Sequence, residues 1–484
     1  MSNSTLLPSC RSGNSSGKQT ALVVVTLLVL SGCATVDFDK SVANTNEQAA
    51  SFTNGQLALV RSDDQRAEMD EIAGEILSKP VGQSDAVRLT LVNSPALQAL
   101  LAQNWADATN AAQTGRIANP VFGFQRLRFA DELELERLLA FGLLDLLTLP
   151  QRYKMAEAQI AHQQLRLTNT VIDQVTMVRQ AWVRAVAAQQ SLVYAKQVND
   201  AAQASSELAR RMQAVGNFSK LQRARQQAFY ADAATQWAVA QHVSVATREE
   251  LTRLLGLTES QAESLVLPDR LPDLPAGPRS AEDVSKSVSK ERLDIQLARA
   301  ELDAQAKAQG LNLVTSFTDI ELGVRRDTVF DNAAGTSTSR RGYEVSLRLP
   351  IFDWGDNQRD AMNAQTLAAA NRLEATVRAG GSSLRESYSA YRTAFDVSKH
   401  YRDEVVPLRK LISEENVLRY NGMLIGVFEL LADTRDQVSS VIAAIAAEQQ
   451  FWLTDAALQA AIIGKPTMAT VGAMASGRNG DAAH

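Results

Sequence analysis

Residues that build metal sites, disulfides and sharp chain breaks are scarce in this chain. Its 484 residues include two cysteines, four histidines and 12 prolines, and the histidines lie far apart without paired spacing. Such a sequence offers no thiolate or histidine cluster, and we therefore expect no metal site. It also has no nucleophile–histidine–acid motif and no phosphate-binding glycine loop, so we expect no cofactor and no catalytic residues.

Basic residues are slightly fewer than acidic ones. Lysine and arginine number 49 against 54 aspartates and glutamates, which gives a formal net charge of −5 at pH 7. A mildly acidic chain argues against nucleic acid as a partner. The few prolines fall mostly in short clusters, as at residues 268–278, and very long proline-free segments run between them. This pattern favours long helices over compact α/β domains.

The first 33 residues have the features of an export signal. Arg11 and Lys18 precede the apolar run ALVVVTLLVL at residues 21–30, which is shorter than the ~20 residues that a membrane-spanning helix needs. The run ends in Leu30-Ser31-Gly32-Cys33, which resembles the bacterial lipobox. The resemblance implies that Cys33 carries acyl chains, palmitate among them, which anchor an exported lipoprotein in the cell envelope. The alternative is an ordinary signal peptide that is cut elsewhere and leaves a free thiol.

The mature chain repeats one plan at a period near 200 residues, marked by LTLP at 147–150 and LRLP at 347–350. A period this long indicates that a whole unit has been duplicated. We therefore expect a signal peptide at 1–32, a polar lead-in that is partly disordered or wraps the surface at 33–84, a first repeat at 85–267, a proline-rich linker at 268–279, a second repeat at 280–466 and a flexible tail at 467–484.

Four long helices are expected, at residues 151–214, 218–255, 357–420 and 427–463. In the first, Val175, Val178 and Trp182 belong to a stripe with helical spacing. At 1.5 Å per residue this helix extends roughly 95 Å, so it needs neighbours alongside, as in a coiled coil or helical barrel. Gly380-Gly381 falls inside the third helix and indicates a kink or a close helix contact, with a plain loop as the alternative.

Two hairpins are expected between these helices. In the second half, strands at 311–326 and 342–349 flank a long polar loop at 327–341. In the first half, residues 121–129 alternate as a strand. The leucine-rich stretch 132–149 fits a helix nearly as well as a strand, and we predict a strand because the repeat places it opposite 342–349. Strands of ~9–11 residues with polar turns suit an outer-membrane β-barrel. So few strands cannot close a barrel in lipid, and several chains must contribute.

Several short motifs, in order and at duplicate positions, resemble those of the TolC-like outer-membrane factor family. NSPAL at 93–97 is similar to the family's helix opening and RLDI at 292–295 to its second-half partner. PIFDWG at 350–355 is similar to the end of the family's last strand, and RYNG at 419–422 to its helix break. Together the similarities cover nearly the whole mature chain.

The resemblance implies a mainly α fold with a small β part. It comprises a long α-helical coiled-coil barrel and four β-strands per chain, which contribute to a trimeric, twelve-stranded outer-membrane β-barrel. The resemblance also implies a homotrimer that works with a periplasmic adaptor protein and an inner-membrane pump. Such a trimer is the passive exit duct of a tripartite efflux or type I secretion system, and it is not an enzyme.

The helix after the second break is the expected place of a gate. The family's acidic positions correspond to Glu429 and to Ala432, next to Asp433, while the first half has Gln222 at the matching place. Three copies of Glu429 would make a ring of like charge that attracts cations. The alternative is that these carboxylates lie on a solvated outer face.

Residues beside the breaks complete the predicted gate. Arg211, Arg419 and Tyr420 would bond between neighbouring coiled coils, or the arginines simply complement carbonyls at their helix ends. Gly216 and Gly422 are expected to supply the positive φ of the chain reversals, and the adaptor is expected to contact them there.

Two other functions compete with the exit duct. One is a periplasmic coiled-coil scaffold lipoprotein that never spans the outer membrane, which the weak first hairpin favours. The other is an enzyme, which needs a convergent polar pocket that this sequence does not indicate. The sequence does not identify the transported substrate.

Overall fold

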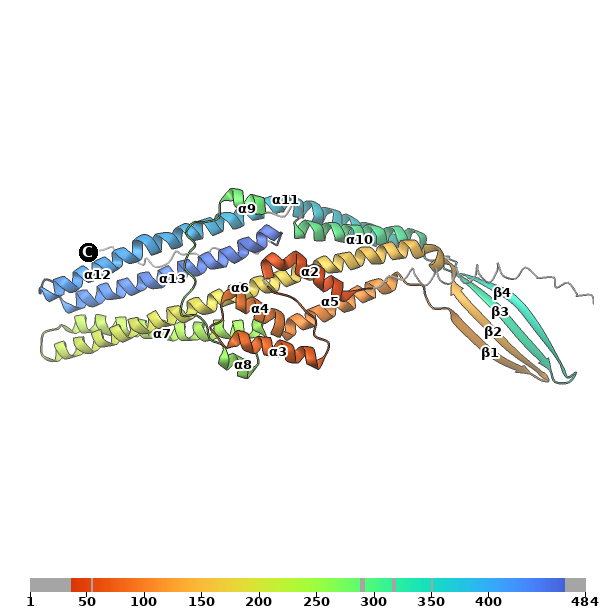
Figure 1. Ribbon diagram of the computed structural model, residues 1–484, viewed down its shortest axis with the longest axis horizontal. Coiled ribbons are helices and arrows are strands. Elements are labelled where there is room, and N and C mark those ends of the chain that lie inside the picture. The colour runs from red at the N-terminus through yellow and green to blue at the C-terminus, as the bar shows by residue number, and fades with distance from the viewer. Residues whose placement is uncertain (1–35, 54, 288–291, 316–318, 350, 466–484) are drawn as a thin grey trace, which may run out of the picture. The chain divides into compact units, whose positions relative to one another are not determined.

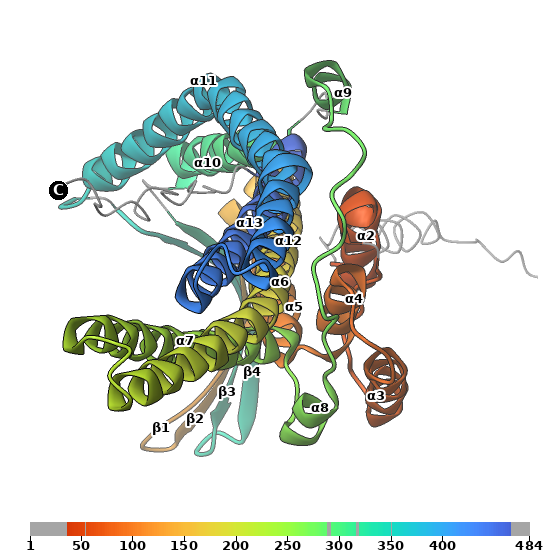
Figure 2. The same cartoon turned by 90° about the vertical axis from the view of Figure 1, so that its left-hand side faces the viewer.

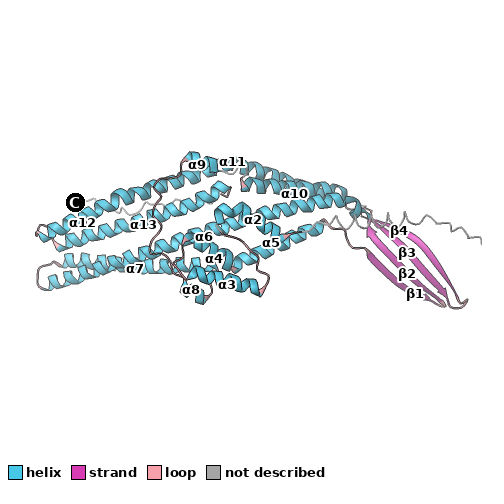
Figure 3. Ribbon diagram, in the orientation of Figure 1, coloured by secondary structure: helices cyan, strands magenta, loops and turns pink. Residues whose placement is uncertain are grey.

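The computed structural model describes residues 36–465 except 54, 288–291, 316–318 and 350. The predicted signal peptide, Cys33 and the predicted tail therefore lie outside the described residues. The described chain is mostly helical and contains a four-stranded sheet (Figure 3). It divides into two compact units: one holds the sheet, in Asp107–Ala161 and Glu301–Ala368, and the other holds Asp37–Ala106, His162–Ala300 and the chain from Ala369 onwards.

The four strands are antiparallel and follow one another in chain order (Figure 1). They are β1 (Val121–Phe129), β2 (Glu132–Gly142), β3 (Ile320–Asp331) and β4 (Thr336–Leu347). Ala130 and Asp131 form the first hairpin turn, and Asn332–Gly335 forms the second. β1 and β4 are the edges of this sheet, and their outer backbone groups are available to pair with another strand.

The strand predictions are confirmed in part. β1 has the predicted bounds, whereas β2 ends at Gly142 and the rest of the leucine-rich stretch is helical. Leucine is a strong helix former, so the leucine-rich sequence is compatible with either a strand or a helix, and packing in the folded chain determines which one forms. The predicted loop at 327–341 is wrong, because most of it is paired strand with a short turn. Its polar residues lie on both faces of the sheet: Thr336, Thr338 and Arg340 on one, and Ser337, Ser339 and Arg341 on the other.

Long helices make up most of the remaining chain (Figure 1). They are α5 (Pro95–Thr114), α6 (Leu143–Ala214), α7 (Lys220–Leu255), α10 (Leu293–Thr315), α11 (Asp356–His400), α12 (Val406–Asn421) and α13 (Val427–Ile463). A π-helical turn at Tyr401–Val405 joins α11 to α12. The four predicted long helices are confirmed, and α13 has the predicted bounds. Residues 311–315, predicted as strand, belong to α10 instead.

Local sequence signals fix several helix ends. Ser219 and Gln222 form a capping box at the start of α7. Gly256 ends α7 in the left-handed conformation with φ of +70°. Gly380 lies inside α11, so the loop alternative is wrong. Its carbonyl accepts a 2.8 Å hydrogen bond from Arg292 Nη1, and a Cβ there would lie 3.5 Å from the guanidinium.

The lead-in is helical rather than partly disordered over most of its described residues. It forms α2 (Phe38–Thr53), α3 (Asp63–Leu77) and the start of α4 (Gln83–Asn93). Phe38, Val42 and Phe52 are buried at helical spacing along α2. Most other residues of α2 are polar, so this apolar stripe is not evident from the sequence alone.

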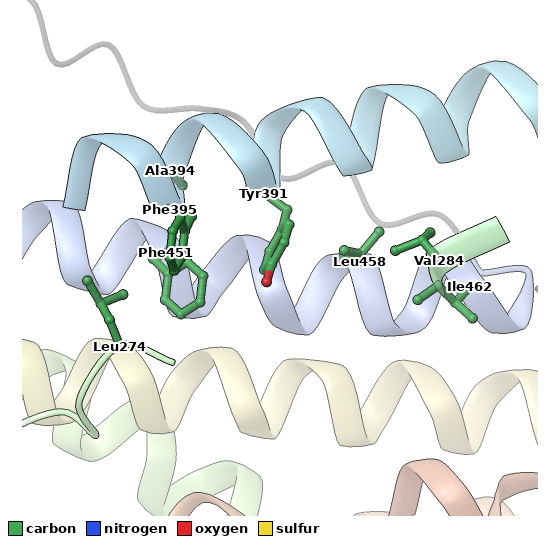
Figure 4. Close-up of a cluster of buried hydrophobic side chains, with 8 residues drawn as sticks. All are labelled: Leu274, Val284, Tyr391, Ala394, Phe395, Phe451, Leu458 and Ile462. Carbon is green, nitrogen blue, oxygen red and sulfur yellow. The ribbon is translucent and has the colours of Figure 1, made fainter. Parts of the chain in front are cut away.

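The proline-rich linker lies against α11 and α13. It runs between two short helices, α8 (Glu259–Ser264) and α9 (Ala281–Ser287) (Figure 2). Trp452 Nε1 donates a 3.0 Å hydrogen bond to the Pro272 carbonyl, and the Arg279 backbone N–H donates one of 3.1 Å to the Tyr391 hydroxyl. Figure 4 shows the core cluster that the linker joins, composed of Leu274, Val284, Tyr391, Ala394, Phe395, Phe451, Leu458 and Ile462.

Candidate functional site

The two helix reversals, α6–α7 and α12–α13, carry the predicted gate residues. At the first, Gly216 has φ of +84°, and the Asn217 N–H donates a 2.9 Å hydrogen bond to the Met212 carbonyl. At the second, Gly422 has φ of −79°, so the expected positive φ is wrong there. Met423 takes the left-handed conformation instead, with φ of +59°. The Leu424 N–H closes this turn on the Arg419 carbonyl at 2.8 Å.

Aromatic contacts join the two reversals. The rings of Phe218 and Phe428 stack with centroids 4.4 Å apart. One step further from the turns, the Arg435 guanidinium lies 5.3 Å from the Phe229 ring centroid. Val438 of α13 packs against a cluster of Val198, Ala202 and Ala233. The end of each helical hairpin is therefore held against the other within one chain.

The two predicted acidic residues lie one turn apart on α13. Glu429 belongs to the first turn, where its charge is favourable at a helix N-terminus, and its side chain is exposed. Asp433 is half-buried, and its Oδ2 is shielded from solvent without a hydrogen-bond partner. A shielded carboxylate oxygen without a donor is unfavourable, so Asp433 is the more strained of the two.

The remaining predicted gate residues are exposed. Arg211 donates from Nε to Glu207 Oε1 at 2.8 Å, within its own helix. The two arginines Arg210 and Arg211 hold the pKa of Glu207 down at about 2, mainly through these hydrogen bonds. Arg419 and Tyr420 have no side-chain hydrogen bond to a described residue of their own chain, so both are available to a neighbouring molecule.

Apolar side chains at the reversals were missed by sequence reasoning. Met423 and Leu424 are 93% and 73% exposed, and Val215 and Leu221 beside the first break are 72% and 62% exposed. Single exposed apolar residues are ordinary, but four at two adjoining turns form a patch that suits a partner protein. The signal was present in the sequence as apolar letters on either side of the turn glycines.

A buried polar cluster was also missed. Arg179 of α6 is 6% exposed, and its Nη1 donates to Gln459 Oε1 at 2.6 Å while Nη2 donates to the Phe52 carbonyl. Burial lowers the pKa of Arg179, and burial raises the pKa of nearby Asp455, which lies 3.6 Å from Arg279. These groups join α2, α6, α13 and the linker, which is a structural role.

A groove of about 450 Å³ runs along α6 and α7. Val239, Ala240 and Val243 of α7 line it opposite Ala188 and Ser191 of α6. Val239 and Val243 are exposed in the single chain. A largely apolar groove between long helices is suited to receiving another helix.

The sheet has two unlike faces, because directly opposite residues point the same way and neighbours along a strand point opposite ways. One face, here called the apolar face, includes Phe122, Phe124, Leu133, Leu135, Leu139, Phe141, Leu322, Val324, Phe330, Tyr343, Val345 and Leu347. The other, the acidic face, includes Glu132, Glu134, Glu136, Glu321, Asp327, Asp331 and Glu344. An apolar face on one side and a polar face on the other is the pattern of a barrel that separates lipid from a lumen.

No helix among the described residues combines the length and the apolar character that a membrane crossing requires. Within the same residues, no three His, Cys, Asp or Glu side chains come together in a way that would hold a metal ion.

Solved structures similar to this chain include an outer-membrane channel and other membrane proteins. The Campylobacter jejuni outer membrane channel CmeC matches with a TM-score of 0.65 and 14% identity over 85% of this chain and 89% of its own. The Vibrio cholerae outer membrane protein VceC matches with a TM-score of 0.60 and 13% identity over 83% and 97%. A Pseudomonas aeruginosa membrane protein gives a TM-score of 0.60 and 18% identity over 83% and 94%.

The chain has the TolC-like outer-membrane channel fold. No protein-family model and no curated protein matches the sequence. The fold is similar although the sequence identity with each of these structures is below 20%. The fold depends on helix periodicity, turn geometry and strand alternation, which many different sequences satisfy.

Proposed function

We propose that this protein is the outer-membrane channel of a tripartite efflux or type I secretion system, a passive exit duct formed by three copies. The observation that carries the proposal is the four-stranded sheet with an apolar face, an acidic face and two unpaired edges. In lipid, every backbone N–H and C=O must be paired, so such a sheet cannot stand alone. Similarity to solved outer-membrane channels supports the same conclusion.

Assembly follows from the edges and the groove. β4 of one copy pairs with β1 of the next, and three copies close a twelve-stranded barrel whose acidic face lines the lumen. The apolar groove along α6 and α7 receives a helix of the neighbouring copy, which covers Val239 and Val243. Acyl chains on Cys33 add an anchor in the outer membrane while the long helices extend into the periplasm.

The helix reversals form the periplasmic end of the duct in this proposal. Glu429 from three copies constricts the pore entrance, with Asp433 behind it. Arg419, Tyr420 and Arg211 bond between neighbouring copies and hold the end closed. A periplasmic adaptor protein binds near Gly216 and Gly422 and covers the exposed apolar patch. The inner-membrane pump supplies the energy.

Single-channel conductance of the purified protein in planar bilayers tests the proposal. We expect a heat-stable trimer that conducts, and we expect Glu429→Ala to raise conductance and to weaken block by divalent cations. Glu386→Ala is the matched control, since it removes another exposed carboxylate, on α11 and 36 residues before Gly422 in the chain.

A monomeric protein that conducts no ions would refute the channel and favour the periplasmic scaffold. A conducting trimer in which Glu429→Ala and Glu386→Ala behave alike would leave the channel intact and remove Glu429 from the gate.

A further inference from the structure

The apolar face of the sheet carries five arginines and, in the described strands, no carboxylate. Arg126 and Arg128 come from β1, Arg137 from β2, Arg326 from β3 and Arg341 from β4. Arg137 is directly opposite Arg326, and Arg326 is directly opposite Arg341, so three guanidinium groups form a row across three strands. We call these five residues the arginine belt.

The belt is not neutralised within the chain. None of the five forms an ion pair with a described residue, and four of them are exposed. On the acidic face, by contrast, Arg325 forms ion pairs of 2.6 Å with Glu136 and 2.8 Å with Asp327. Like charges directly opposite one another destabilise a sheet. A row of three unpaired arginines therefore needs anions from outside the chain.

The arginine row lies midway along β2, β3 and β4. Between this row and the hairpin turns the same face carries Arg126, Arg128, Thr328, Ser337 and Ser339 together with Leu133, Leu135 and Phe330. The next row towards the helices is Phe122, Leu139, Val324 and Tyr343, and the two rows after it include Leu322, Val345 and Leu347. Rows on one face are about 6.8 Å apart, so the apolar part below the arginine row extends about 20 Å along the strands. The apolar band of an outer-membrane barrel is about 25 Å tall.

Strands of such barrels are tilted by about 35–45°, so about 20 Å along the strands is roughly 15 Å of height, and the arginine row lies in the half of the apolar band nearer the hairpin turns. An arginine at the bilayer midplane is unfavourable by about 2–4 kcal/mol, against about 0–1 kcal/mol near the interface. Long arginine side chains also reach from apolar surface to the headgroups. If the helices extend into the periplasm, as in the proposed function on which this inference rests, the belt lies at the outer leaflet.

We propose that the arginine belt is a binding surface for the phosphate groups of a multiply phosphorylated glycolipid of the outer leaflet. The guanidinium group binds phosphate oxygens in a bidentate geometry and stays charged at any physiological pH. The backbones of the three arginines in the row lie on neighbouring strands about 4.8 Å apart. Guanidinium groups this close together favour a headgroup with more than one phosphate over a lipid with a single one.

Binding of diphosphorylated lipid A to the purified full-length protein tests the proposal, with phosphatidylglycerol and inorganic phosphate as separate probes. The test variant is Arg137→Gln/Arg326→Gln/Arg341→Gln. The control is Arg340→Gln/Arg225→Gln/Arg385→Gln, which removes the same charge from exposed arginines outside the apolar face. We expect the test variant to lose about tenfold or more in affinity for lipid A and the control to bind as the wild type does.

Three outcomes would overturn the proposal. They are undiminished binding by the test variant, equal loss in the control, and wild-type binding of phosphatidylglycerol or inorganic phosphate as tight as that of lipid A.

If the glutamine variant does not assemble, Arg137→Lys/Arg326→Lys/Arg341→Lys decides, because it keeps the charge and loses the bidentate geometry. Undiminished affinity of the lysine variant would also overturn the proposal. Conductance of the wild type, measured in parallel, tests the channel itself and so separates failure of the lipid site from failure of the proposed function.

Discussion

Replacing Glu448 with glutamine is expected to stabilise the protein above neutral pH and to change little in acid. Glu448 lies on α13 and is half-buried beneath the proline-rich linker. Burial, and then repulsion from Asp273 of the linker, raise its pKa from 4.5 to about 7, against the opposing effects of Arg270 and Arg402. The folded protein therefore binds this proton more tightly than the unfolded chain does.

The sign and size of the effect follow from linkage. Between pH 4.5 and about 7 the folded state holds the proton and the unfolded state releases it, so the free energy of unfolding falls as pH rises through this window. A shift of this size corresponds to about 3 kcal/mol in a fully buried site, and partial exposure of Glu448 reduces it to roughly 1 kcal/mol. Glutamine keeps the shape and removes the ionisation.

Urea-unfolding midpoints in detergent, measured for wild type and Glu448→Gln from pH 4 to pH 9, check this prediction. The free energy of unfolding follows from each midpoint and the m-value. The difference in this free energy between Glu448→Gln and wild type should be constant below pH 4.5, should grow by roughly 1 kcal/mol up to pH 7, and should then level off. Glu386→Gln, on the exposed surface of α11, is the control. A difference that stays flat across the whole range would refute the argument from burial.

Two further substitutions probe the packing. Phe451→Ala, in the cluster that joins the linker to α11 and α13, should destabilise the protein by about 3–5 kcal/mol, and thermal unfolding would show a lower midpoint. Gly256→Ala should destabilise it by more than about 1 kcal/mol, because φ is +70° and the new Cβ would lie 2.5 Å from Pro95 Cδ. Gly277→Ala, where a Cβ meets nothing within 4 Å, is the matched control and should leave the midpoint unchanged.

Helix bounds were the most predictable part of this fold. The predicted helix at 427–463 and the predicted end of the first long helix at Ala214 agree with the structure. These ends follow from local chemistry, since glycine beside an apolar helical stripe stops a helix wherever the segment lies. The turn at the second helix reversal was less predictable. Sequence reasoning assigned the positive φ to Gly422, but the closing hydrogen bonds of the turn place it at Met423.

The hairpins were harder to predict, and β3–β4 shows why. Arg325, Asp327 and Arg340 look like loop residues in a sequence, but their polarity belongs to one face of the sheet. Alternation is clear in a sequence only when apolar residues occupy one face of the strand and polar residues occupy the other. In β3 and β4 the apolar face itself contains Arg326 and Arg341, which interrupts the pattern at its middle. Arg326 and Arg341, which belong to the arginine belt, are therefore also the residues that obscured the strand pattern in the sequence.

The same alternation makes the register of the hairpins decisive. A slip of one residue would move every arginine of the belt to the acidic face and every carboxylate to the apolar face. The turns oppose such a slip. Ala130 takes a φ of +51° in a two-residue turn, and Asp331 Oδ1 accepts from the N–H groups of Ala333 and Ala334 at 2.9 Å. The Asn332 N–H also donates to the Asp131 carbonyl at 2.8 Å, which ties one hairpin turn to the other. The positive φ at Ala130 is a local cost that accompanies this turn geometry, which sets the side chains that share each face of the sheet.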